Sequence, residues 1–451
     1  MAELLHKNYT KESEVMVDYT SKVITVEKAL EFVKSDSCIV AAMAASEPQA
    51  FLENLHTIAD RVKNVNVNMC LSLRNYEFLE SAKYEESFDA VSTFFGPGSR
   101  MAQKKRKISY FPNNLHFMGQ KRFRAIKPNI FIGTGTYPDE HGYLSLSLAN
   151  VYEKEAIEAA DMIIIEVNKK YPRTFGDVEI HLNDVDYLIE TDYDLLEVPN
   201  AEPNEKDLII GKLISEYIND GDCIQLGIGG IPNAVAKSLY GKKNLGVHTE
   251  MITDEMIHLA KAGVINGKCK TLHKGKMVAA FAMGSREMYD YLDNNPSVRI
   301  FSGAYVTDPY LIAQNDNQVS INTTLEVDLT GQCCSESLGS RTFSGTGGQT
   351  DTAVGAQMSK NGRSFIALYS TAMVRNPKTG EREEISKIVC QLKQGAAVSL
   401  SRNDVQYLVT EYGVANLEGL SIKERVEKII SIAHPKFREQ LIQEAKDVGL
   451  I

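Results

Sequence analysis

The residue of this sequence with the clearest potential for chemistry is Glu250, which ends the short segment 246–250. A carboxylate at the end of a strand can act as a nucleophile, as a base or as a salt-bridge partner. Taken alone, a salt-bridge or solvated role is the commoner one for such a residue. His248, two positions earlier, is likewise more often a satisfied polar side chain than a catalyst.

A glycine-rich loop at residues 227–230 follows the apolar run 224–226 and precedes Glu250. Glycine lets backbone amides approach a ligand closely because no Cβ is in the way. A helix that begins after such a loop adds partial positive charge for a phosphate. The dinucleotide fingerprint GxGxxG requires a sixth glycine where this chain has Pro232. Taken alone, the loop therefore indicates either a phosphate site or a tight structural turn.

A second glycine turn lies within residues 343–351, which read FSGTGGQTD. The backbone N–H groups of Gly347 and Gly348 could stabilise an oxyanion, and a plain surface loop is the alternative. Ser344 lacks the GxSxG strand–turn–helix context, so a serine hydrolase is disfavoured. The sequence has no HExxH motif or spaced Cys/His set, and we expect no metal site.

These residues require a scaffold of parallel strands covered by helices. Short apolar runs alternate with helical patterns, which is typical of α/β folds. Ligands bind at the carboxyl ends of strands in such folds, so the glycine loop and Glu250 are expected at neighbouring strand ends. Ser421 and Glu424 predict a capping box at the start of a late helix, which Pro435 should stop. The candidates for buried strands are residues 162–167, 277–283, 298–301, 365–369 and 406–410.

Two segments of the chain, residues 29–55 and 212–239, resemble each other. Each reads as helix, polar turn, apolar strand, small-residue loop, proline and helix, and both contain Cys-Ile and Pro-(Gln/Asn)-Ala. We interpret this as an internal duplication rather than chance. The polar segment 198–206 contains two prolines and predicts a linker. We therefore expect two similar open α/β domains with largely parallel sheets, residues 1–200 and 201–451, and an active cleft between them.

Composition narrows the class of protein. The 451 residues are 43% hydrophobic and can bury a full core, while the net charge of −10 argues against a nucleic-acid partner. The basic runs 104–107 and 121–124 indicate solvated surface or a local anion site. Seven cysteines without CxxC spacing predict a reduced, cytoplasmic protein. Residues 1–7 lack the apolar core of a signal peptide, and no apolar run approaches the roughly 20 residues of a membrane span.

Ordered landmarks along the chain carry a family resemblance. They are residues 46–50 (SEPQA), 138–143 (PDEHGY), 166–168 (EVN), 172–177 (PRTFGD), 227–229 (GIG), 325–332 (LEVDLTGQ), 410–415 (TEYGVA) and 432–438 (IAHPKFR). With these motifs the sequence resembles, over essentially its whole length, the class I coenzyme A transferases of the acetyl-CoA hydrolase/transferase family. The 4-hydroxybutyrate CoA-transferases and butyryl-CoA:acetate CoA-transferases are close relatives.

The resemblance implies roles for particular residues. The family position that matches Glu250 is the nucleophile, which becomes a glutamyl-CoA thioester, and the turn that matches Gly347 and Gly348 contributes CoA contacts and an oxyanion donor. Two departures imply an altered acyl pocket: Thr352, where Phe is common, and residues 41–45, where the family has a more polar or glycine-rich turn. CoA is implied as a substrate rather than a tightly bound cofactor, and the loop that would cradle it consists of Gln225, Leu226, Gly227, Ile228 and Gly229.

The implied activity is a ping-pong transfer of CoA between a short-chain acyl-CoA (acetyl-, butyryl- or 4-hydroxybutyryl-CoA) and a carboxylate. The resemblance also suggests a homodimer or dimer of dimers, with no nucleic-acid or membrane partner. One alternative is an acyl-CoA hydrolase of the same fold, in which water attacks the intermediate. Another is a dinucleotide-binding or purely structural α/β protein, against which Pro232 counts. The sequence does not identify the acyl group.

Overall fold

Seven parallel strands form a sheet in the amino-terminal half of the computed structural model, which describes residues 18–105, 107–198, 200–376 and 379–451. The strand order is β4-β3-β2-β1-β5-β7-β9, so the first strand of the chain lies in the middle. The strands are β1 Cys38–Ala41, β2 Val65–Met69, β3 Phe88–Ser92, β4 Ile108–Tyr110, β5 Ile130–Gly135, β7 Met162–Val167 and β9 Tyr187–Glu190.

A second sheet of eight strands forms in the carboxyl-terminal half, in the order β15-β13-β11-β10-β16-β21-β25-β26. Only the edge pair β25–β26 is antiparallel. The strands are β10 Cys223–Leu226, β11 Gly246–His248, β13 Met277–Ala279, β15 Val298–Ile300, β16 Gln318–Thr323, β21 Arg363–Ala367, β25 Tyr407–Thr410 and β26 Gly413–Asn416.

The two sheets share one topology. In each, the first strand is central, the next three follow outward on one side, and the later strands lie on the other side. The central strands β1 and β10 belong to the two segments that resemble each other in sequence. This agreement confirms the predicted α/β class with two similar, largely parallel sheets. The division of the chain at residue 200 remains a prediction.

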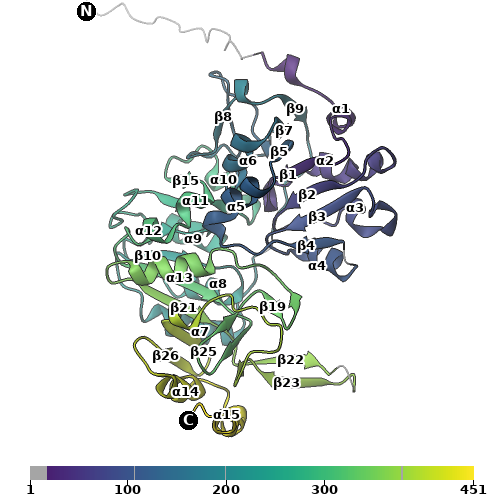
Figure 1. Cartoon of the computed structure of the whole chain (residues 1–451). Helices are drawn as coiled ribbons and strands as arrows, with labels where there is room; N and C mark the ends of the chain where they lie inside the picture. Colours follow the sequence, from purple (N-terminus) through teal and green to yellow (C-terminus); the bar gives the residue numbers. More distant parts are fainter. Residues whose placement is uncertain (1–17, 106, 199, 377–378) are drawn as a thin grey trace, which may run out of the picture.

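Helices pack around both sheets (Figure 1). In the amino-terminal half these are α1 Val26–Glu31, α2 Gln49–Asn54, α3 Glu77–Glu80, α4 Pro97–Lys104, α5 Met118–Ala125 and α6 Glu153–Ala159. In the carboxyl-terminal half they are α7 Glu205–Ser215, α8 Gly230–Lys237, α9 Asp254–Lys261, α10 Arg286–Leu292, α11 Gly303–Val306, α12 Pro309–Ile312, α13 Gln349–Met358, α14 Ile422–Ser431 and α15 Pro435–Asp447. Among the described helices, none is long and apolar enough to span a membrane.

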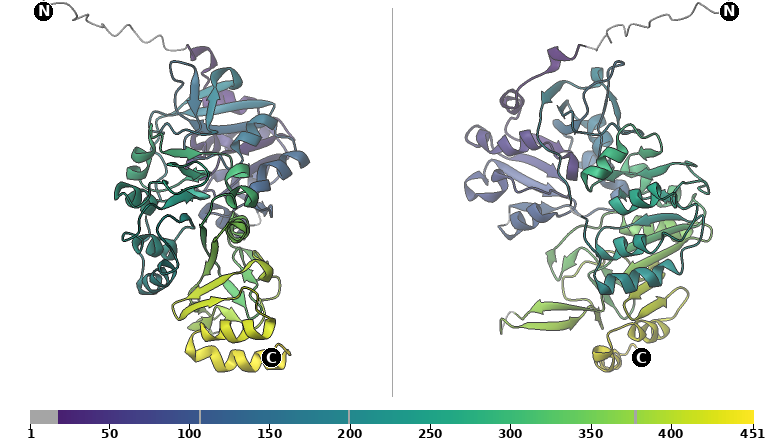
Figure 2. Two further views of the ribbon diagram at one scale, coloured as in Figure 1. Left: turned by 90° about the vertical axis from the view of Figure 1, so that its left-hand side faces the viewer. Right: turned by 180° about the vertical axis from the view of Figure 1, so that it is seen from behind.

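Small sheets of two or three strands lie apart from the two large sheets in both halves of the chain. The hairpin of β22 and β23 extends away from the body of the molecule near α14 and α15 (Figure 2). The remaining strands and this hairpin are β6 Tyr143–Ser145 with β8 Glu179–His181, β12 Met251–Ile252 with β14 Phe281–Ala282, β17 Glu326–Asp328 with β18 Cys333–Cys334 and β24 Ile388–Val389, β19 Ser337–Leu338 with β20 Arg341–Thr342, and β22 Thr371–Arg375 with β23 Arg382–Ser386.

Most predicted elements are present, with two corrections. The run 277–283 is not one strand, because the chain leaves the large sheet after Ala279 and continues as β14 in a separate pair. The capping box of Ser421 and Glu424 forms as predicted. Pro435 does not simply stop that helix but occupies the first turn of α15, where its missing N–H costs nothing. Residues 1–7, Arg106 of the first basic run and Pro199 of the expected linker lie outside the described residues.

Candidate active site

Glu250 lies where the chain leaves the large carboxyl-terminal sheet. β11 ends at His248, and the two-residue strand β12 starts at Met251. The Glu250 carbonyl accepts hydrogen bonds from the amides of Ala280 (2.9 Å) and Phe281 (3.2 Å), which fix this bend. Because β10 and β11 pair in parallel, Glu250 and the loop after β10 lie at the same sheet edge, as expected.

The second glycine turn holds the Glu250 carboxylate. The backbone N–H of Gly348 donates to Oε2 at 2.8 Å. A Cβ built on Gly348 would lie 2.4 Å from the same oxygen, so a side chain here would displace the carboxylate from this hydrogen bond. Burial raises the pKa of Glu250 to about 7; the Gly348 hydrogen bond opposes this rise and the charge of Asp351 adds to it. Among the described residues no cation contributes, which argues against a salt-bridge role.

The amino-terminal half holds this turn in place. The Leu115 amide donates to the Gly347 carbonyl at 3.2 Å. His116 Nδ1 lies 2.8 Å from Asp351 Oδ1, and the His116 amide donates to Oδ2 at 3.1 Å. Asp351 lies in the first turn of α13, and this helix begins directly after Gly348. These contacts therefore fix both the turn and the helix that follows it. Sequence reasoning missed His116, because nothing near it in the chain signals a partner 235 residues away.

The loop after β10 forms another wall of the same site. Of the five residues predicted to cradle CoA, four line the cavity that holds Glu250: Gln225, Leu226, Gly227 and Ile228. Gly229 is not among the lining residues; it has φ 113°, a conformation that favours glycine, and open space around it. The Gln225 side chain is buried, and its Oε1 accepts from the Ser320 hydroxyl at 2.9 Å.

The start of α8, considered in sequence as a phosphate site, already has a carboxylate beside it. A Cβ on Gly230 would come within 2.4 Å of Asp207 Oδ2. Asp207 accepts hydrogen bonds from the Asn204 amide (2.9 Å) and the Tyr369 hydroxyl (2.6 Å). Within the second basic run, Arg122 is engaged in the fold, since its guanidinium donates to Asn68 Oδ1 at 2.6 Å, whereas Lys121 and Arg124 are exposed.

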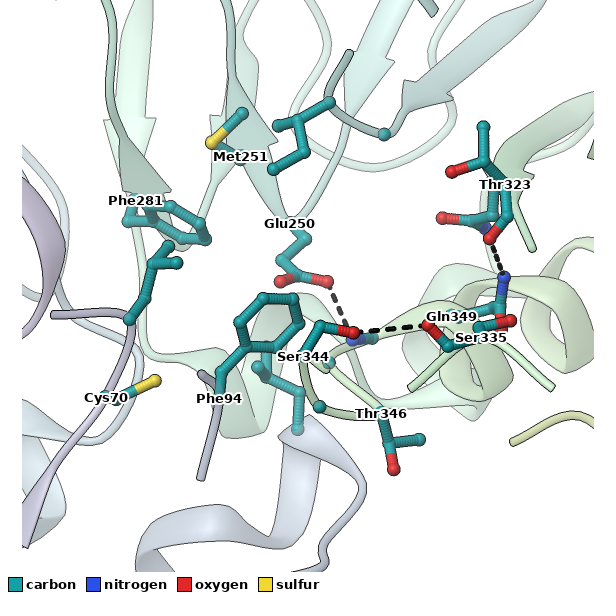
Figure 3. Close-up of a pocket in the computed structure, with 18 of the residues that line it drawn as sticks. Cys70, Phe94, Glu250, Met251, Phe281, Thr323, Ser335, Ser344, Thr346 and Gln349 are labelled. Carbon is teal, nitrogen blue, oxygen red and sulfur yellow. Dashed lines mark hydrogen bonds between the residues drawn. The ribbon is translucent and has the colours of Figure 1, made fainter. Parts of the chain in front are cut away.

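One cavity of about 170 Å³ joins these groups and takes its lining from both halves. Loops after β1, β2 and β3 contribute Met43, Cys70, Leu71 and Phe94, opposite the loops after β10, β11 and β16. The carboxyl edges of the two sheets thus lie on opposite sides of the cavity. Figure 3 shows the Glu250 carboxylate in the middle, with a hydrogen bond to the turn that follows Thr346.

Three other positions singled out in the sequence have different outcomes. His248 is buried, its Nε2 lies 2.8 Å from the Val306 carbonyl, and burial lowers its pKa to about 3, so it is a neutral structural residue. Thr352 does not line the cavity; its hydroxyl accepts from the Asn322 amide at 3.0 Å, and Asn322 does line it. The departure at residues 41–45 does reach the cavity, through Met43.

Comparisons with known proteins give the family. Residues 7–198 match the acetyl-CoA hydrolase/transferase N-terminal domain, and residues 284–445 match the acetyl-CoA hydrolase/transferase C-terminal domain. The 4-hydroxybutyrate coenzyme A transferase of Clostridium kluyveri is 40% identical over 429 residues, which are 95% of this chain and 98% of that one. RipA from Yersinia pestis has a crystal structure that covers 96% of this chain and 99% of its own, with a TM-score of 0.87 and 35% identity. The crystal structure of the 4-hydroxybutyrate CoA-transferase of Porphyromonas gingivalis covers 95% of this chain and 98% of its own, with a TM-score of 0.76 and 34% identity. The chain therefore belongs to the acetyl-CoA hydrolase/transferase family.

Proposed function

We propose that this enzyme transfers coenzyme A between a short-chain acyl-CoA and a free carboxylate, through a covalent glutamyl-CoA intermediate at Glu250. The observation that carries the proposal is the 2.8 Å hydrogen bond from the Gly348 N–H to Glu250 Oε2. Glu250 is the one carboxylate among the described residues that line this cavity. The names of relatives that act on 4-hydroxybutyrate and on butyrate and acetate support short acyl groups.

The proposed chemistry conserves the activated acyl group. A Glu250 oxygen attacks the thioester carbonyl, the C–S bond breaks, and an acyl-glutamyl anhydride and the CoA thiolate result. The thiolate then attacks the glutamyl carbonyl, which releases the first carboxylate and leaves a glutamyl-CoA thioester. A second carboxylate reverses both steps and departs as the new acyl-CoA. The site holds the reacting groups together, which compensates for the weak nucleophilicity of a carboxylate.

The glycine turn has a role in this scheme beyond holding the nucleophile. Negative charge develops on a Glu250 oxygen when the thiolate adds to the glutamyl carbonyl. A backbone N–H that already lies on that oxygen stabilises this charge without reorganisation. In the proposal, Gly347 and Gly348 supply this donor and CoA contacts, while residues 225–229 cradle CoA, whose distant nucleotide part contributes binding free energy.

We further propose that the enzyme works in the cytoplasm as a homodimer or dimer of dimers, without a nucleic-acid or membrane partner. A reducing compartment is supported by the seven cysteines, all of which are free. The oligomeric state rests on the family resemblance. Light scattering coupled to size-exclusion chromatography measures the mass in solution, and a monomer of 50.1 kDa would contradict this part of the proposal.

The second candidate function, an acyl-CoA hydrolase, shares the intermediate and differs in the final acceptor. The test is release and transfer of CoA from acetyl-CoA, with and without a panel of short carboxylates. A transferase forms new acyl-CoA only when an acceptor is present. Rapid release of free CoA without an acceptor would favour the hydrolase instead. The Glu250→Ala variant should abolish both reactions, because no other lining carboxylate can form the anhydride.

A further inference from the structure

The cavity around Glu250 is divided into an apolar side and a polar side. The apolar side consists of Met43, Cys70, Leu71, Phe94, Met251 and Phe281. The polar side consists of Asn322, Thr323, Ser335 and Gln349. In Figure 3 the labelled polar residues lie to the right of the Glu250 carboxylate, whereas the labelled apolar residues lie to its left, above it and below it. A ligand that reacts with Glu250 therefore extends into two different environments.

The apolar side offers no partner for a charged or strongly polar group. Among the described residues that line the cavity there is no Lys, Arg or His. Apart from the two methionine sulfurs, the Cys70 thiol is the one polar side-chain group among the described residues of the apolar side, and a thiol is a weak hydrogen-bond donor. Burial raises the pKa of Cys70 to about 12, so the thiol stays protonated. A hydroxyl or carboxylate placed there would lose its hydrogen bonds to water, and the side chains of the apolar side would not replace them.

The backbone around the apolar side is held in a fixed and strained shape. Ala44 has φ 53° and Leu71 has φ 50°, conformations that non-glycine residues rarely adopt. Glu153, itself buried, accepts a hydrogen bond from the Met43 amide at 3.1 Å. Strain of this kind persists only where the surroundings impose it, and it gathers at ligand sites. The apolar side is therefore preformed and does not readily rearrange to receive a polar group.

The polar side has an unpaired acceptor. The Gln349 Nε2 amide donates to the Thr323 carbonyl at 2.8 Å, while Gln349 Oε1 is buried and has no partner in the described part of the chain. A buried, unpaired amide oxygen is costly unless a ligand supplies a donor. The pantetheine arm of CoA carries amide N–H groups. This match orients the ligand, with the CoA arm on the polar side and the acyl chain on the apolar side.

We infer that the acyl subsite of this enzyme selects uncharged, apolar acyl chains and rejects short chains that end in a hydroxyl or a carboxylate. The inference rests on the proposed function and deepens it by naming the substrate class. By this inference the acyl specificity of this chain differs from that of the relative named for 4-hydroxybutyrate, although the two sequences are 40% identical. Cys70, Leu71 and Met43 are the specificity-determining residues.

Two pairs of acceptor acids with matched shapes test the inference. Pentanoate and 4-hydroxybutyrate differ by a terminal methyl or hydroxyl group, and 4-methylpentanoate and succinate differ by an isopropyl or carboxylate group. With acetyl-CoA as donor, kcat/KM should favour pentanoate by about tenfold to a hundredfold, and 4-methylpentanoate by more than about a hundredfold. Ratios near one, or a preference for the polar acid, would overturn the inference.

A binding measurement keeps the test independent of turnover. Calorimetric titration of the Glu250→Gln variant should show tighter binding of pentanoyl-CoA than of 4-hydroxybutyryl-CoA, again by about tenfold or more. If no acceptor is used by the wild-type enzyme, the proposed function fails, while these two affinities still decide the acyl subsite. Equal affinities would contradict the inference.

Cys70→Ser supplies a stronger hydrogen-bonding group at the apolar side with almost no change in shape. It should shift the pentanoate to 4-hydroxybutyrate ratio of kcat/KM toward the hydroxy acid by about three- to tenfold. Cys223→Ser is the matched control, since Cys223 is also buried but starts β10 and does not line the cavity. An unchanged ratio in a folded Cys70→Ser enzyme, or the same shift in both variants, would remove Cys70 from the subsite.

Discussion

At the scale of single residues, Glu250 combines two properties that oppose each other. A dehydrated carboxylate is the better nucleophile, but dehydration also favours its protonated, unreactive form. Here burial raises the pKa of Glu250 to about 7, and the Gly348 hydrogen bond limits the rise. The carboxylate is thus available at neutral pH without being fully solvated.

This environment predicts a pH dependence with a definite sign. In the proposed mechanism the carboxylate form of Glu250 reacts, so kcat/KM for acyl-CoA should rise with pH and level off above an apparent pKa near 7. Below that value it should fall about tenfold per pH unit. Because the charge of Asp351 raises the pKa of Glu250, Asp351→Asn should move the profile to lower pH. A profile that is flat between about pH 5 and 8 would contradict this assignment.

The close contact at Gly348 predicts a second outcome. Gly348→Ala places a Cβ 2.4 Å from Glu250 Oε2, which must displace either the carboxylate or the donor N–H. We expect kcat to fall by about a hundredfold or more with little change in melting temperature. Gly241→Ala is the control, because an added Cβ there meets no atom within 4 Å. Near-normal activity of Gly348→Ala would show that the turn does not act on Glu250.

At the scale of elements, the site depends on a turn that one half of the chain supplies and the other half holds. Local patterns predict elements such as β7, whose bounds match the predicted strand 162–167. They do not predict that the run 277–283 divides between two sheets, because that break depends on the hydrogen bonds from Ala280 and Phe281 to the Glu250 carbonyl. Tertiary pairing, rather than hydrophobicity, decides that boundary.

The His116–Asp351 contact predicts the effect of loosening this turn. His116→Ala removes the 2.8 Å side-chain bond but leaves the backbone N–H on Asp351, so the fold should persist. We expect kcat to fall by about tenfold to a hundredfold, with a smaller change in the KM for acyl-CoA, because the proposed oxyanion donor would be misplaced rather than removed.

The control for this variant is His56→Ala, because the His56 ring lies against the Glu53 carbonyl and the Tyr84 ring and does not line the cavity. His116 does not touch the reacting atoms and acts as a positioning residue. A positional role predicts that the apparent pKa of the kcat/KM profile shifts, since Asp351 changes the charge around Glu250. A loss of melting temperature without a change in kcat or in the pH profile would mean that the contact is only structural.

At the scale of the whole molecule, duplication explains why the site lies between the halves. Two sheets with the same strand order present their carboxyl edges to one cavity, so each half supplies loops from equivalent positions. The repeated sequence segments made this architecture predictable, and Glu250 and the two glycine segments could be named in advance. The apolar side of the cavity could not be predicted, because nothing in the sequence around Cys70, Leu71 and Phe94 indicates a site. These residues meet Glu250 only through the packing of the two sheets.

Covalent trapping of CoA on the enzyme tests the glutamyl-CoA intermediate at Glu250 directly. Incubation with acyl-CoA in the absence of an acceptor, followed by borohydride reduction, converts a glutamyl thioester to an alcohol that peptide mass spectrometry locates. We expect modification at Glu250 alone, none in Glu250→Ala, and loss of most activity in Glu250→Asp, in which the carboxylate is one methylene short of the thioester. Modification at a different residue, or a fully active Glu250→Ala enzyme, would contradict this mechanism.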